Sequence, residues 1–164
     1  MFTGALAASY YGLPRTTMDV DIIVKVTEKN VQTFAAQLRK AGIQASEQSI
    51  HEAFKSGYRI MTLKDKNTPF SLDIILSNKK LEKNSGTILG SPTFYQTPEA
   101  LILSKLRMIK ATIPKERALK DKDDVRAILR YTKIDMNNLK RRARTESTIS
   151  ILEELTRGKD SPIS

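Results

Sequence analysis

One alternating segment constrains the fold of this chain more than any other feature. Residues 18–26 read MDVDIIVKV, and every second residue is β-branched. Successive side chains of a strand point to opposite faces, so this pattern predicts a strand with one buried face. The other face would carry Asp19 and Asp21, two carboxylates about 7 Å apart along the chain.

The segments around this strand predict a mixed α/β region. Residues 4–11 are Ala-rich and helix-compatible, and Gly12 with Pro14 would stop the helix, with Gly12 as a left-handed C-cap. Further elements follow from periodicity and turn residues: a helix over 28–41 begun by Thr27 and ended by Gly42, a short helix over 49–55, strands over 58–63 and 70–76 paired as a hairpin through residues 64–69, and an extended segment over 92–96. Residues 78–90 show no clear pattern, with Ser85 and Gly86 as a loop.

The rest of the chain predicts helices only. Thr97-Pro98-Glu99 is a helix start with Thr97 as N-cap, and further helices are expected over 120–131, 136–144 and 148–157. We therefore expect an α/β (α+β) fold, a mixed twisted sheet flanked by helices. It would divide into a core at 1–96 and a helical C-terminal subdomain at 97–164.

Composition narrows the chemistry. The chain has 164 residues, 40% of them hydrophobic, which suits about one domain with its own core. It has no cysteine and a single histidine, His51, which we expect at the surface. Disulfides, Cys/His zinc sites, thiol nucleophiles and two-histidine catalysis are excluded. No apolar run reaches the length of a membrane helix, so we expect a cytoplasmic protein with no membrane contact.

The charge is strongly positive and uneven. The formal net charge is +10, and residues 101–164 hold 16 basic and nine acidic residues. This excess fits a polyanionic partner such as nucleic acid, although a solvated basic surface gives the same count. The run Lys140-Arg141-Arg142-Ala143-Arg144 is open to the same two interpretations, an RNA contact or an exposed charged helix.

A third carboxylate extends the acidic pair. Asp73 lies within the otherwise apolar segment FSLDIIL, where an ionised group is costly unless it is paired or bound to metal. If this strand lies beside the first, Asp19, Asp21 and Asp73 converge. Such a trio suits Mg²⁺, which takes carboxylates together with water and phosphate oxygens, and could hold two ions. An acidic strand face without chemistry is the competing interpretation.

The same residues resemble a known family. Gly4-Ala5-Leu6-Ala7, followed by the run from Tyr11 to Asp21, resembles the signature of the DNA polymerase β-like nucleotidyltransferases, in particular the AbiEii/MenT-type toxins. That pattern is Gly-Gly-x-Ala, then Gly-x-Pro-Arg-x-Thr-x-Asp-x-Asp. Residues 99–106 resemble the family's Glu-x-x-x-x-x-Lys-Leu helix, and Arg117, Lys120-Asp121 and Asp124-Val125 resemble its last motif. The resemblance spans roughly residues 3–130.

The resemblance implies a nucleotidyltransferase fold and Mg²⁺-dependent transfer of a nucleoside monophosphate from an NTP to a hydroxyl, with pyrophosphate released. It implies two Mg²⁺ ions, replaceable by Mn²⁺, on Asp19, Asp21 and Asp73, the last helping to deprotonate the acceptor. The implied nucleotide-binding residues are Gly4, Arg15, Thr17, Lys105, Asp121 and Asp124. Gly4 would approach the triphosphate, Arg15 and Lys105 would neutralise phosphate charge, and Asp121 or Asp124 would orient Lys105 or contact the nucleotide.

The acceptor stays open at this point: tRNA or another RNA ranks first, with small-molecule or protein hydroxyls as alternatives. Two departures from the family favour a second hypothesis, a non-catalytic nucleotide- or RNA-binding protein or a toxin–antitoxin component. Ala5 replaces a Gly or Ser, and Gly4 lies only four residues from Met1. Either the true start lies upstream, or the first sheet strand is lacking. In the second case a homodimer partner or an antitoxin would have to cover that edge. Five aromatic residues are expected in the core rather than stacked on bases: Tyr10, Tyr11, Phe34, Phe54 and Tyr58.

Overall fold

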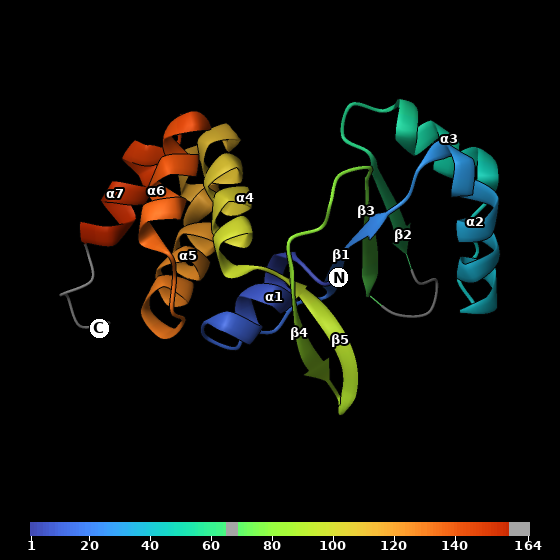
Figure 1. Ribbon diagram of the computed structural model, residues 1–164, viewed down its shortest axis with the longest axis horizontal. Helices are drawn as coiled ribbons and strands as arrows, with labels where there is room; N and C mark the ends of the chain where they lie inside the picture. The colour runs from blue at the N-terminus through green and yellow to red at the C-terminus, as the bar shows by residue number, and fades with distance from the viewer. Residues whose placement is uncertain (65–68, 158–164) are drawn as a thin grey trace.

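The computed structural model describes residues 1–64 and 69–157 (Figure 1). Within them the chain is a mixed α/β fold with seven α-helices, as the sequence predicts, but its strands form two small sheets rather than the single mixed sheet that was expected. The helices are α1 (Gly4–Tyr11), α2 (Val31–Lys40), α3 (Glu47–Lys55), α4 (Pro98–Ala111), α5 (Leu119–Tyr131), α6 (Met136–Thr145) and α7 (Ile149–Arg157). The strands are β1 (Asp19–Lys25), β2 (Ile60–Lys64), β3 (Ser71–Ser77), β4 (Lys83–Ile88) and β5 (Ser91–Gln96). Short 3₁₀ turns at Glu28–Asn30 and Lys115–Ala118 precede α2 and α5.

The larger sheet contains the acidic strand. Its order is β1-β3-β2, with β1 parallel to β3 and β2 antiparallel to β3. The predicted pairing of the segments around 58–63 and 70–76 is confirmed, while residues 65–68 of their connection lie outside the described residues. The predicted alternation in β1 is also confirmed, because Ile22 and Val24 pack with the helices while Asp19 and Lys25 are exposed.

Helices α2 and α3 cover one face of this sheet. Amphipathic spacing gives each helix one apolar stripe, and the stripes meet the β-branched residues of the strands. The resulting core contains Val26, Val31, Ala35, Leu38, Ala45, Ile50, Ala53, Met61, Ile74 and Leu76. The opposite face carries Asp19, Asp21 and Asp73, and we call it the acid face.

The first three residues cover the remaining edge of β1. The Thr3 N–H donates to the Asp21 carbonyl (3.0 Å) and the Ile23 N–H donates to the Met1 carbonyl (2.8 Å). Phe2 in turn exchanges backbone hydrogen bonds with β5, donating to Phe94 and accepting from Gln96. The segment Met1–Thr3 therefore connects the two sheets. The edge of β1 that was expected to need a partner subunit has an intrachain neighbour along Asp21–Ile23.

The hairpin β4–β5 is an element that the sequence did not predict as such. Its first strand, KNSGTI, is polar and mostly exposed, so no apolar alternation indicates it. The turn is formed by Leu89 and Gly90, both with positive φ (47° and 78°), and Leu89 is fully exposed. Pairing with the predicted extended segment, rather than burial, defines β4.

Helices α4–α7 build a second core together with α1, on the far side of the hairpin from α2 and α3 (Figure 1). Ala7, Ala8, Tyr11 and Tyr95 share this core with the C-terminal helices. The division at residue 96/97 stays a prediction, but α1 packs with the C-terminal side. No helix within the described ranges is long and apolar enough to cross a membrane.

Several local expectations need correction. Gly12 is not a left-handed cap (φ −122°); it is a close contact, where a Cβ would lie 2.9 Å from the Cβ of Ala127. Thr97 precedes α4 but makes no capping hydrogen bond. Tyr58 is 86% exposed rather than buried, because it precedes β2 in an open turn, and Tyr10 is 46% exposed.

Candidate active site

Three carboxylates gather on the acid face because β1 and β3 run parallel. The register places Asp21 opposite Asp73 and Asp19 opposite Ser71. Neighbouring strands lie about 4.8 Å apart, so Asp21 and Asp73 are direct neighbours across the pair. The predicted convergence of the two acidic strands is therefore present in the fold.

Two hydroxyl groups fix the outer carboxylates. The Ser71 hydroxyl donates to Asp19 Oδ1 (2.5 Å), and the Thr62 hydroxyl on β2 donates to Asp73 Oδ1 (2.6 Å). Each bond occupies one carboxylate oxygen and leaves Oδ2 for another partner. No local pattern indicates Thr62 or Ser71, because their roles depend on strand register.

Asp21 lies against the N-terminus of α1. The Ala5 N–H faces its carboxylate and favours the charged form, which lowers the pKa of Asp21 slightly. Gly4 has φ +57°, and a Cβ at this position would overlap the Asp21 carboxylate. Only glycine fits there, so one reason for Gly4 is close approach to Asp21, which differs from the expected approach to a triphosphate.

The charge on Asp21 is poorly compensated. Burial raises the pKa of its carboxyl group, and repulsion from Asp73 and Asp19 adds to this, against smaller opposing contributions from Lys105 and the Ala5 N–H. A cation beside the three carboxylates would remove this cost.

The donor set fits a hard divalent cation. Within residues 1–64 and 69–157, no three Asp, Glu, His or Cys side chains are gathered tightly enough to cage an ion alone. Mg²⁺ does not require such a cage, since it is commonly held by one or two carboxylates plus water and phosphate oxygens. In the described part of the chain no hydrogen bond engages Oδ2 of Asp19 or of Asp73, so these two atoms, with Asp21 opposite Asp73 on β1, offer that kind of partial site.

Asp124 on α5 organises the cations of the site. Its carboxylate accepts two hydrogen bonds from Arg15: Nε donates to Oδ1 (2.9 Å) and Nη2 donates to Oδ2 (3.0 Å). Lys105 Nζ, from α4, lies 2.7 Å from Asp124 Oδ2, the oxygen that also accepts Arg15 Nη2, and 2.9 Å from Asp121. Arg15 belongs to the loop before β1, so this network ties that loop to α4 and α5.

The centre of this network, Asp124 with Lys105, is buried. Asp124 and Lys105 are 6% and 5% exposed. Burial alone would raise the pKa of Asp124, but the hydrogen bonds from Arg15 and Lys105 outweigh it and lower that pKa. The Asp124 hydrogen bonds likewise raise the pKa of Arg15. The expected orientation of Lys105 by Asp121 or Asp124 thus has a geometric basis in both residues.

Thr17 acts on the backbone rather than on a ligand. Its hydroxyl lies 3.1 Å from both the N–H and the carbonyl of Asp19. It fixes the start of β1 and thereby the placement of Asp19. A nucleotide contact for Thr17 stays a prediction.

A search of protein-family models and of curated proteins found no match to this chain.

Proposed function

We propose that this protein is an Mg²⁺-dependent nucleotidyltransferase, which moves a nucleoside monophosphate from an NTP to a hydroxyl acceptor, with an RNA end as the first choice of acceptor. The observation that carries the proposal is the pairing of Asp21 with Asp73 across parallel strands, with Asp19 beside them. Asp21 is partly buried with its charge poorly compensated, and such a carboxylate is expensive to keep unless it is used.

The proposal also includes the fold. A sheet with the acidic strand parallel to its neighbour, a helix directly before it and helices behind it is consistent with a minimal nucleotidyltransferase fold. The short segment Met1–Thr3 would then serve as the strand between β1 and β5.

The reaction divides among the chain's own groups. The acceptor hydroxyl oxygen forms a bond to the α-phosphorus of the NTP while the bond from that phosphorus to the bridging oxygen breaks, and pyrophosphate leaves. Asp73 takes the proton of the acceptor hydroxyl, since Oδ2 is free of the Thr62 bond. Mg²⁺ held by Asp19, Asp21 and Asp73 would supply the charge that stabilises the attacking and leaving oxygens.

Arg15 and Lys105 supply the remaining positive charge. Both side chains form salt bridges with Asp124, so Asp124 sets their positions before any ligand binds. Lys105 contacts Asp121 as well, whose side chain is 28% exposed, so a phosphate oxygen can replace the more exposed carboxylate as partner of the ammonium.

The test is transfer of label from each α-³²P-NTP to total RNA with Mg²⁺, run beside the γ-labelled NTP. The proposal predicts label on the acceptor from the α-phosphate only, and its loss in the Asp19→Asn/Asp21→Asn variant. Asp123→Asn, a change in an exposed carboxylate on α5, is the matched control and should keep full transfer. Equal labelling by wild type and double variant would contradict the proposal.

A second candidate is a non-catalytic protein of the same fold that binds nucleotide or RNA, or acts within a toxin–antitoxin pair. One observation favours it: both phosphate-binding candidates, Arg15 and Lys105, are already neutralised by Asp124 and Asp121. This candidate predicts nucleotide or RNA binding that survives Asp21→Asn, with no label transferred by the wild type.

A further inference from the structure

The acid face continues past the carboxylates as an apolar row. Two residues beyond Asp21 and Asp73, the register pairs Ile23 with Ile75 and Ile75 with Ile60. Alternation places all three isoleucines on the acid face. Ile60 is 42% exposed, and Ile23 and Ile75 are partly exposed, so this row is not fully covered by the fold.

The same face extends onto the β4–β5 hairpin. Thr3, opposite Asp21, donates its hydroxyl hydrogen to Gln96 Oε1 (2.5 Å), which places Gln96 on the acid face. Phe94 lies two residues earlier in β5 and therefore shares that face. Phe94 is 42% exposed, and Lys83 Nζ lies 3.6 Å from the centre of its ring.

Lysines border this apolar row on one side. Lys25 follows Ile23 on the acid face, and the exposed Lys79 and Lys80 come two and three residues after Ser77, the register partner of Lys25. Among the described residues no ion pair engages Lys25, Lys79, Lys80 or Lys83.

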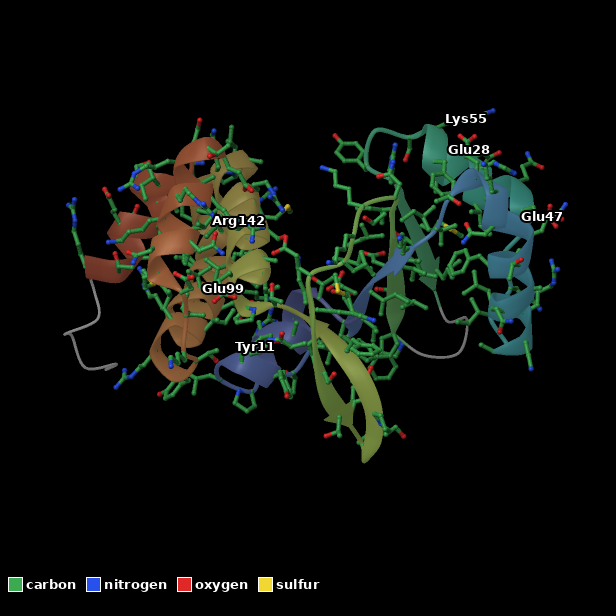
Figure 2. The ribbon with its side chains drawn as sticks, viewed as in Figure 1. Tyr11, Glu28, Glu47, Lys55, Glu99 and Arg142 are labelled. Carbon is green, nitrogen blue, oxygen red and sulfur yellow. The ribbon has the colours of Figure 1, made fainter. Side chains whose placement is uncertain are left out.

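The nearest acidic residue in the sequence does not neutralise Lys83. Glu82 is instead bound through both oxygens by Arg142 of α6, labelled in Figure 2, at 2.7 and 2.9 Å. The Glu82 carbonyl also accepts the Thr97 N–H, which holds the start of β4 in place. Lys83 is thus held over the Phe94 ring on a fixed backbone, and no carboxylate among the described residues pairs with its charge.

We propose that this surface, Phe94 with Lys83 and the row Ile23, Ile75 and Ile60, binds the unpaired end of a single-stranded RNA. A base stacks on Phe94, the lysines contact phosphates, and the terminal hydroxyl faces Asp21 and Asp73. Proteins that bind single-stranded nucleic acids stack bases on aromatic rings and contact phosphates with lysines, whereas an apolar row without them would suit a peptide. The link to the carboxylates rests on the proposed function; the binding surface does not.

The test is equilibrium binding of a fluorescent single-stranded oligoribonucleotide to the whole chain, with no NTP and no Mg²⁺. Phe94→Ala should weaken binding by roughly five- to a hundredfold, the loss of one stacked base, and Phe94→Tyr should restore it. Lys83→Gln should reduce the slope of log K against log salt concentration by about 0.7, the loss of one phosphate contact.

The matched control is Tyr131→Ala. Tyr131 is also an exposed aromatic residue (54%) under a cation, Arg130 at 5.7 Å, but it ends α5 rather than lying on the acid face. The Tyr131→Ala variant should bind RNA as tightly as the wild type does. If Phe94→Ala fails to fold, Phe94→Leu keeps apolar volume without a ring and should show the same loss.

Absence of RNA binding by the wild type, unchanged binding by a folded Phe94→Ala variant, or equally tight binding of a blunt RNA duplex would overturn the inference. The outcome separates from that of the proposed function. RNA binding that depends on Phe94, without any label transfer, would support this inference and contradict the proposed nucleotidyltransferase activity. Label transfer with Phe94→Ala binding RNA normally would do the reverse.

Discussion

At the scale of single residues, Asp124 makes the contacts with the largest consequence. It neutralises two cations from separate parts of the chain, Arg15 and Lys105, in a nearly buried position. Asp124→Asn should therefore lower the free energy of unfolding at pH 7 by about 3 kcal/mol, because it leaves the buried Lys105 with Asp121, a partly exposed carboxylate, as its one charged partner among the described residues. Asp123→Asn, which removes only an exposed pair with Arg126, should change it by less than about 0.5 kcal/mol. Urea unfolding of the two variants measures this, and equal losses would contradict it.

Asp124 also makes the stability of the folded protein sensitive to acid. The pKa of Asp124 is lowered in the folded state, so the folded chain binds its proton less readily than the unfolded chain. Its contribution to stability is then complete above the ordinary carboxyl pKa of about 4 and is lost as the pH falls through the lowered pKa. Melting temperature followed from pH 6 downward should fall more steeply below pH 4 for the wild type than for Asp124→Asn. Parallel curves would contradict this assignment.

Asp21 should behave in the opposite way to Asp124. Its carboxylate is partly buried and faces two others, while an asparagine oxygen can still accept the Ala5 N–H. In EDTA at pH 7, Asp21→Asn should raise the free energy of unfolding by about 1 kcal/mol through relief of repulsion. A clear loss of stability in EDTA would instead mean that Asp21 is a structural partner of α1 and Lys105.

At the scale of elements, the placement of α1 depends on a contact that the sequence did not reveal. Gly12 lies against Ala127 and the backbone of Ile128 in α5 (3.1 Å for a Cβ to the Ile128 nitrogen). Gly12→Ala should cost about 1–3 kcal/mol, since the two helices must move apart. Gly57→Ala, where a Cβ meets nothing within 4 Å, is the control and should be close to neutral. Thermal unfolding of both variants measures the difference, and equal effects would show that the contact carries no weight.

The elements with strong periodicity could be predicted from the sequence, and those defined by partners could not. Strand β1 and helix α4 follow from alternation and from the Thr97-Pro98-Glu99 start. Strand β4 is polar and exists through pairing with β5. Likewise Asp19 and Asp21 were predicted from their spacing on one strand face and Asp73 from its cost in an apolar strand, whereas Thr62 and Ser71 act through a register that local sequence does not specify.

At the scale of the whole molecule, three sets of contacts link the sheet that carries the acid face, the hairpin β4–β5 and the C-terminal helices. They are the segment Met1–Thr3 between β1 and β5, the Arg15–Asp124–Lys105 network, and the Arg142–Glu82 pair. The first contacts Asp21 through the Thr3 N–H, and in the second the charge of Lys105 acts on Asp21 by lowering the pKa of its carboxyl group. The carboxylates thus come from the sheet on one side of the molecule, Lys105 and Asp124 come from the helices on the other side, and α1 with the hairpin lies between these two parts (Figure 1).

The central claim is that β1 and β3 together form a divalent cation site, and the most direct test is Mn²⁺ binding followed by electron paramagnetic resonance, with Mg²⁺ as competitor. The account predicts saturable Mn²⁺ binding that Mg²⁺ displaces, that NTP strengthens, and that Asp21→Asn and Asp73→Asn each weaken at least tenfold. The exposed-site variant Asp123→Asn should bind as the wild type does. Mn²⁺ binding that is weak, non-saturable or unchanged in both site variants would contradict the account.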